Sequence, residues 1–310
     1  MIASAAIRQS RFQMTEALEL YAAHPAIFAA IVAFFGALVG SFLNVVACRL
    51  PARQQWESQL DAGGEHARPM VQIDGAPPGL LSPASHCPRC LTPIKPWHNI
   101  PIAGWFLIGG RCASCRAPVS FRYPLIELLT AVVSGALALH VGVTAPLPSS
   151  LIVLWSLIAL ALIDHDTQTL PDVLTQPLLW WILAASAMGW GPIPPGQAIM
   201  GAMWGYLAAC LAGRCYYAVT GQIGLGGGDY KLFAALGALS GASSLWPAAL
   251  LAGLSLTALA LTQSARARLV PAQPGTSLEL PFGPHLALAG IANLFGAHHW
   301  FYGLIGLPGW

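Results

Sequence analysis

Long apolar runs separated by short polar segments dominate the chain. The runs cover residues 26–48, 123–142, 149–165, 173–190, 197–219, 232–262 and 283–304. Run 232–262 is longer than the ~20 residues that cross a bilayer once as a helix. Because the sequence Gly-Ala-Ser-Ser at 241–244 interrupts this run, we interpret it as two crossings. The pattern therefore predicts about eight transmembrane helices.

The composition agrees with a membrane protein. Hydrophobic residues make up 56% of the 310 residues, and charged residues make up only 8%. The charged fraction is far below the ~25% that is usual in soluble domains. The net charge of +2 is too small to favour a nucleic-acid partner. We therefore expect an all-α polytopic membrane protein that contacts lipid and binds no nucleic acid.

The basic residues predict an orientation in the membrane. Eight of the 14 Lys and Arg residues lie within 49–122, and cytoplasmic loops carry such an excess. Segment 49–122 is therefore expected on the cytoplasmic side of a bacterial inner membrane, with much of 54–86 irregular because of its Pro, Gly and scattered charges. Three regions are predicted: an N-terminal arm with the first span (1–48), a cytoplasmic loop (49–122) and a transmembrane helical body (123–310).

The cytoplasmic loop contains two Cys-x-x-Cys pairs, CPRC and CASC, at Cys87, Cys90, Cys112 and Cys115. Their spacing is close to the zinc-ribbon pattern, in which four thiolates close a tetrahedral structural Zn²⁺ site. Disulfides are the competing interpretation, and a reducing cytoplasm disfavours them. His86 and His98 are neighbouring alternative ligands, but four cysteines suffice. The loop is thus predicted to hold a small zinc module; no internal repeat is expected anywhere in the chain.

Five of the 12 acidic residues lie inside or at the ends of apolar runs: Glu127, Asp164, Asp166, Asp172 and Asp229. Burying a charge in hydrocarbon costs at least ~2.5 kcal/mol, so such residues are functional candidates. Strict alternation of the spans places Asp164 and Asp229 on one membrane side. Two facing carboxylates share a proton, so one can activate water while the other polarises a carbonyl, as in aspartic peptidases. A transporter or an assembly factor that uses these acids without catalysis is the alternative.

The remaining charged residues near the apolar runs are given lesser roles. Asp166 follows Asp164 by two residues, about 200° around a helix, and is expected in solvent. Asp172 is expected to start a helix or to form a turn, and Thr175, with Pro177 in the first turn, is a competing helix start. Glu127 either extends toward the membrane surface or binds a basic leader or a free amine. Lys231 is expected to mark the membrane edge, with an effect on the neighbouring carboxylate as the alternative.

Several stretches, taken together and in this order, resemble the type IV prepilin peptidases, which serve type IV pili and type II secretion. They are GSFLNVVACRLP (40–51), the two cysteine pairs with HNIP between them, RYPLIE (122–127), ALIDHDTQTLPD (161–172), GGGDYKLFAALG (226–237) and PFGP (281–284). The resemblance implies a membrane aspartic peptidase that cleaves the leader of prepilins and pseudopilins at the cytoplasmic face. It also implies N-methylation of the new N-terminal residue with S-adenosyl-L-methionine.

The resemblance also implies roles for particular residues. Asp164 corresponds to the first catalytic aspartate of the family and Asp229 to the second, within its Gly-x-Gly-Asp motif. The family's link between methylation and the segment around the second cysteine pair points to Gly110 and Arg111 as residues near the methyl donor.

Overall fold

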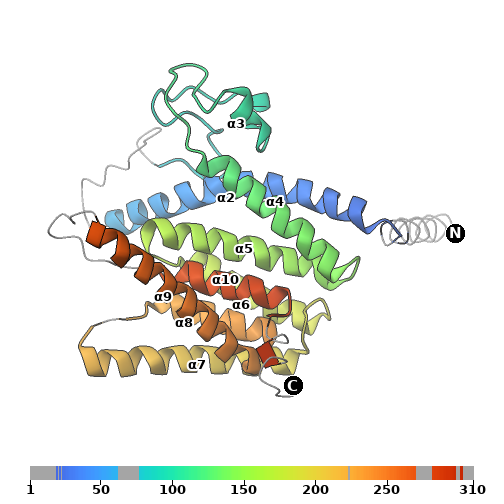
Figure 1. The fold of residues 1–310 in the computed structure, drawn as a ribbon, viewed down its shortest axis with the longest axis vertical. Coiled ribbons are helices and arrows are strands. Elements are labelled where there is room, and N and C mark those ends of the chain that lie inside the picture. The colour runs from blue at the N-terminus through green and yellow to red at the C-terminus, as the bar shows by residue number, and fades with distance from the viewer. Residues whose placement is uncertain are drawn as a thin grey trace. The chain divides into compact units, whose positions relative to one another are not determined.

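Helices build the described part of the chain, which in this computed structural model comprises residues 19, 21, 23–61, 77–222, 224–269, 281–297 and 301–302. Within these residues the only β-structure is a pair of isolated bridges, so the predicted all-α fold is confirmed (Figure 1). The elements are α2 (Pro25–Asp61), η1 (Pro96–Asn99), α3 (Ala103–Leu107), α4 (Arg122–Val141), α5 (Pro146–Thr167), α6 (Asp172–Ala187), α7 (Pro195–Thr220), α8 (Gly227–Ser240), η2 (Ala242–Ser244), α9 (Leu245–Leu269) and α10 (Gly283–Leu294).

Five helical segments are long and apolar enough to cross a membrane: Pro25–Asp61, Arg122–Val141, Pro146–Thr167, Pro195–Thr220 and Ala242–Leu259. The three other predicted spans coincide with α6, α8 and α10, which have 16, 14 and 12 residues and are shorter than the ~20 residues of one full crossing. The predicted break in 232–262 is confirmed, because α8 ends at Ser240 and Gly241 has a φ of 84°. The chain is therefore a membrane protein with both long and short helices.

The first helix extends beyond its predicted end at residue 48 and runs to Asp61. The added residues include strong helix formers such as Ala, Arg, Gln and Glu. An ion pair between Arg53 and Glu57, 2.9 Å apart at (i, i+4) spacing, adds to the stability of this exposed end. Much of 54–86 was expected to be irregular. Residues 54–61 instead continue the helix, residues 77–86 contain no helix, as expected, and residues 62–76 lie outside the described part.

The chain divides into two compact units, Met1–Asn44 with Leu81–Leu151 and Val45–Leu80 with Ile152–Trp310. In the first unit, α2 approaches α4 closely. A Cβ atom on Gly40 would lie only 2.9 Å from the Cα of Glu127, and the Asn44 side-chain amide donates to the Tyr123 carbonyl at 3.3 Å. The GSFLN stretch thus serves this helix contact.

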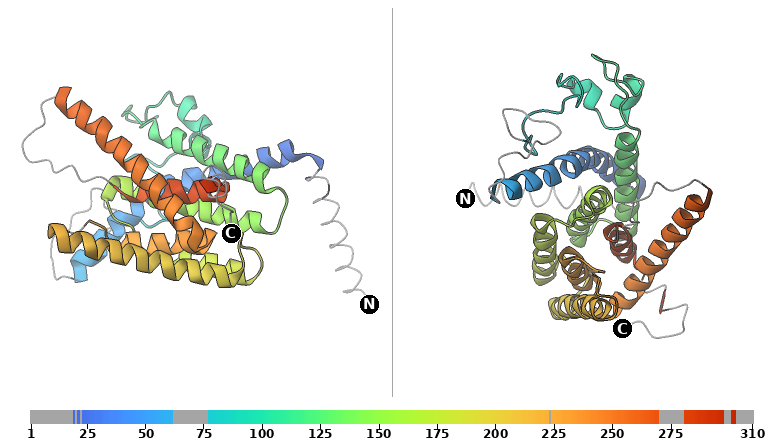
Figure 2. Two further views of the ribbon diagram at one scale, coloured as in Figure 1. Left: turned by 60° about the horizontal axis from the view of Figure 1, so that its bottom comes forward. Right: turned by 90° about the vertical axis from the view of Figure 1, so that its left-hand side faces the viewer.

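In the second unit, α8 is the central helix and packs against α6, α7, α9 and α10 (Figure 2). The α7 and α8 backbones meet at Gly201 and Gly237, where neither residue has room for a Cβ atom, as is common where small residues let membrane helices approach. The main core cluster includes fully buried leucines of three helices: Leu157 and Leu160 of α5, Leu232 and Leu236 of α8, and Leu286 of α10. This packing fixes the helix that begins with the Gly-Gly-Asp stretch.

Candidate active site and metal centre

Asp229 is the third residue of α8 and caps the start of that helix. Its Oδ2 accepts a hydrogen bond of 2.8 Å from the backbone N–H of Gly226, the residue that precedes the helix. A carboxylate in this position also interacts favourably with the helix dipole. Asp229 lies before the apolar run 232–262 and outside the five candidate spans. Partial burial raises the pKa of Asp229 to about 6. The hydrogen bond from Gly226 lowers this pKa, and the charge of Asp164 raises it further. The two predicted aspartates therefore lie within electrostatic range.

Asp164 lies in the last turn of α5 and is only 5% exposed. Its Oδ2 accepts a hydrogen bond of 2.8 Å from the backbone N–H of Gly283, 119 residues further along the chain. Gly283 is the first residue of α10. The carboxylate of Asp164 thus connects the end of α5 to the start of α10.

The segment that follows α5 lies directly against the start of α8. A Cβ atom on Gly228 would be 2.6 Å from the Cβ of Leu170 and 2.9 Å from its carbonyl oxygen. Only glycine permits so close an approach, which explains the last glycine of the stretch before Asp229. This contact places the segment that follows Asp164 against the helix start that contains Asp229.

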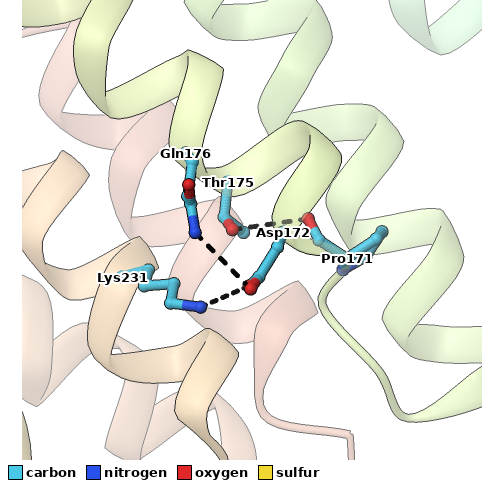
Figure 3. A network of polar contacts seen from close by, with 5 residues as sticks. All are labelled: Pro171, Asp172, Thr175, Gln176 and Lys231. Atoms are coloured by element: carbon cyan, nitrogen blue, oxygen red, sulfur yellow. Dashed lines mark hydrogen bonds and ion pairs between the residues drawn. The ribbon is translucent and has the colours of Figure 1, made fainter.

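A polar network joins the first turns of α6 and α8 (Figure 3). Lys231 Nζ lies 2.5 Å from Asp172 Oδ1, and the side-chain amide of Gln176 donates to Asp172 Oδ2 at 3.5 Å. The Thr175 hydroxyl donates to the Pro171 carbonyl at 3.3 Å. Asp172 begins α6, as predicted. The sequence analysis did not predict this ion pair. Its two residues carry opposite charges and lie at helix starts that are expected on the same side of the membrane, and this pattern could have indicated it.

The other polar residues at the end of α5 lie apart from Asp164. Asp166 and His165 are both exposed, whereas Asp164 is buried. The predicted separation of Asp164 and Asp166 around the helix is therefore confirmed. Of Asp164, His165 and Asp166, only Asp164 is buried.

In the first unit, the four predicted cysteines come together, with all Sγ atoms within 4.8 Å of one another. The Sγ atoms of Cys87 and Cys115 are 3.8 Å apart, and those of Cys90 and Cys112 are 3.9 Å apart. Zn–S bonds of ~2.3 Å in a tetrahedron imply S···S distances of about 3.8 Å, whereas a disulfide bond measures about 2.05 Å. The four thiols therefore fit a metal ion, and the structure contains no disulfide between them.

The thiols of the cysteine cluster differ in their surroundings. Hydrogen bonds to the side chain and the backbone of Thr92 lower the pKa of the Cys90 thiol to about 6. At Cys115 a backbone hydrogen bond at Ala117 lowers the pKa, but burial and the neighbouring cysteines outweigh it and raise the pKa to about 11, so the thiolate form that binds metals is favoured at Cys90 and not at Cys115. His86 and His98 are not members of the cluster. The ring of His86 instead contacts the Ala84 carbonyl at 3.1 Å.

The two cysteine turns have the same local structure. In each turn, the backbone N–H of the first cysteine donates to the carbonyl five residues later: Cys87 to Thr92, and Cys112 to Ala117. The carbonyl of the same cysteine accepts a hydrogen bond from the backbone N–H four residues later. A bridge flanks each turn, His86 with Pro93 and Arg111 with Pro118. The expectation of no internal repeat is therefore wrong at this scale, and the shared pattern Cys-x-x-Cys-x-x-Pro, present in both HCPRCLTP and RCASCRAP, is the signal that was missed.

Glu127 of α4 is buried and holds the segment between the two cysteine turns. Its Oε2 accepts a hydrogen bond of 2.6 Å from the backbone N–H of Ile102, which has the unusual φ of 63°. This contact differs from both sequence-based interpretations of Glu127. The carboxylate connects α4 to the start of α3 within the first unit.

Gly110 and Arg111 lie at the second cysteine turn. Gly110 has a φ of 66°, and a Cβ atom there would lie 2.6 Å from the indole of Trp105. Arg111 is exposed. Packing against Trp105 accounts for the glycine. The role of both residues at the methyl donor stays a prediction.

Comparisons with known proteins divide the chain into two matched segments. Residues 34–141 match the bacterial peptidase A24 N-terminal domain, and residues 151–261 match the type IV leader peptidase family. The first segment contains the four cysteines, and the second contains Asp164 and Asp229. Gly283 lies outside both.

Curated relatives cover nearly the whole chain. The prepilin leader peptidase/N-methyltransferase of Pseudomonas aeruginosa is 41% identical over 286 residues, which is 90% of this chain and 94% of that protein. The protein of the same name from Aeromonas hydrophila is 40% identical over 280 residues, with the same coverage of both chains. The one from Neisseria gonorrhoeae is 43% identical over 215 residues, or 69% of this chain and 75% of that protein. No solved structure matches the chain.

Proposed function

The chain belongs to the type IV leader peptidase family, a family of aspartic peptidases, and we propose that it cleaves the leader peptide of type IV prepilins and pseudopilins with Asp164 and Asp229 as its catalytic pair. One observation carries the assignment of these residues. Each aspartate has one carboxylate oxygen bound by a backbone N–H, at Gly283 and at Gly226, while the charge of Asp164 acts on Asp229.

The proposed mechanism follows from a pair that shares one proton. The ionised aspartate removes a proton from a water molecule, whose oxygen attacks the scissile carbonyl carbon, while the protonated aspartate donates to the carbonyl oxygen. A tetrahedral intermediate forms without a covalent bond to the enzyme. Transfer of a proton to the leaving nitrogen then breaks the C–N bond. Backbone amides that fix one oxygen of each carboxylate keep the other oxygen oriented for this exchange.

We further propose that the four cysteines hold a structural Zn²⁺ ion. Four protein ligands leave no open position for water, so the metal would stabilise the loop and take no part in hydrolysis. The excess of Lys and Arg in 49–122 supports a location in the bacterial inner membrane with the zinc module and both aspartates facing the cytoplasm. Prepilin substrates would present the leader there while their apolar stem stays in lipid.

The names of the relatives support a second activity, methylation of the N-terminal amine that cleavage exposes. S-adenosyl-L-methionine is the proposed methyl donor, and Gly110 and Arg111 are the proposed residues near it. We assign no step of methyl transfer to particular atoms of this chain.

Cleavage of a purified prepilin by the full-length enzyme in detergent tests the peptidase assignment. Asp164→Asn and Asp229→Asn are each expected to lower kcat by about a thousandfold or more, because each removes one proton-transfer group of a pair that acts as a unit. Asp166→Asn is the matched control, since this exposed residue lies two positions from Asp164, and it should cleave like the wild type. Wild-type cleavage by either catalytic variant would refute the proposed function.

A further inference from the structure

The start of α10 contacts the candidate active site through its backbone. Gly283, the first residue of α10, donates its N–H to Asp164 Oδ2 at 2.8 Å, and this hydrogen bond is buried. A hydrogen bond to a charged carboxylate is about twice as strong as one between neutral groups. Because a backbone amide has no side-chain torsion, it also fixes the direction in which the carboxylate points.

The same position has no space for a side chain. A Cβ atom on Gly283 would lie 2.7 Å from Asp164 Oδ2 and 2.8 Å from its Cγ. Gly283 is not among the glycines with positive φ, so alanine can adopt its backbone conformation. The requirement for glycine at 283 therefore comes from the carboxylate of Asp164 and not from the turn.

The residue before Gly283 contacts the other helix that carries a candidate catalytic residue. The ring of Phe282 stacks on that of Phe233, with centroids 6.4 Å apart and an interplanar angle of 27°. Phe233 is one turn after Asp229 on α8. Phe282 and Gly283, two consecutive residues, thus contact both α8 and Asp164 of α5.

We propose that Gly283 is a positioning residue of the peptidase reaction, whose N–H orients Asp164 toward Asp229 while Phe282 fixes this turn against α8. The proposal rests on the proposed function of the aspartate pair. The arrangement parallels that at Asp229, where the N–H of Gly226 binds Oδ2 at the same distance of 2.8 Å. The first turn of α10 is thereby a third element of the site, beside the two stretches that contain the aspartates.

Gly283→Ala in the full-length enzyme tests this role through separate kcat and KM values for prepilin cleavage. The added methyl group must displace the carboxylate, and a displacement of about 1 Å in a catalytic group costs about 100-fold in rate. We therefore expect kcat to fall about 100-fold with KM nearly unchanged. The matched control is Gly253→Ala on α9, where a Cβ atom meets no atom within 4 Å. A kcat for Gly283→Ala equal to that of Gly253→Ala would overturn the proposal.

A second variant keeps the test decisive if Gly283→Ala does not fold, as judged by its melting temperature and gel filtration. Phe282→Leu retains the N–H of Gly283 and loosens its contact with Phe233, so kcat should fall several-fold with KM unchanged. Wild-type kcat in Phe282→Leu would then overturn the proposal. Failure of the proposed function is distinguishable, because it would appear as cleavage by Asp164→Asn, whereas failure of the positioning role would leave Asp164→Asn inactive and Gly283→Ala active.

Discussion

The four-cysteine module and the aspartate site are assembled in opposite ways. The ligands of the module come from two short turns of identical hydrogen bonding, each of which forms within eight residues. The aspartate site combines the end of α5, the start of α8 and the start of α10, and its longest hydrogen-bonded connection spans 119 residues. A metal ion can therefore supply the folding energy of the cysteine module. The geometry of the aspartate site depends instead on how the helices of its unit pack.

The largest effect that distinguishes the two sites is expected in metal binding by the cysteine module. Cys112→Ser removes one of four thiolates, and loss of even an outer-shell partner weakens metal sites 10–100-fold, so we expect zinc affinity to fall by at least about 100-fold. Elemental analysis of the purified variant should find almost no zinc, against one ion per wild-type chain. Cys215→Ser, which changes an exposed cysteine outside the cluster, should retain the metal. Full zinc occupancy in Cys112→Ser would contradict the module.

A smaller effect is expected at the ion pair between α6 and α8. Both side chains are partly exposed, 29% for Lys231 and 58% for Asp172, and such pairs contribute about 0.2–1 kcal/mol. Lys231→Asp and Asp172→Lys each place like charges together and should lower kcat several-fold. The double variant restores opposite charges, so it should be more active than either single variant.

A double-mutant cycle on kcat measures this coupling. Gln176→Ala serves as control, because it removes only the weak contact at 3.5 Å and should leave kcat unchanged. Additive losses in the double variant would show that the pair does not hold α8 against α6.

The sequence predicts the local features of both sites well. Apolar runs locate the helices and the break at Gly241, and the spacing of the cysteines predicts their cluster. Periodicity correctly separates Asp164 from Asp166, because both lie on one helix. These predictions succeed because each depends on residues that are close along the chain.

Contacts between distant segments were not predicted. The Asp172–Lys231 pair and the Gly283–Asp164 hydrogen bond depend on which helices are neighbours, and hydrophobic periodicity does not contain that information. The PFGP stretch belongs to the family resemblance and its prolines predict a rigid turn, but neither feature indicates the contact of Gly283 with Asp164, which depends on how α10 packs against α5. The role of Glu127 was missed for the same reason, because its partner is a backbone N–H at Ile102 that no side-chain pattern marks.

The central claim is that Asp164 and Asp229 act as one catalytic unit. The most direct measurement is the residual rate of prepilin cleavage by Asp164→Asn, Asp229→Asn and the double variant, determined side by side. If the two carboxylates share one proton in one reaction step, removing the second after the first costs little more, so the three residual rates should agree within about threefold. A double variant whose loss is the product of the two single losses would contradict the claim and show that the aspartates act independently.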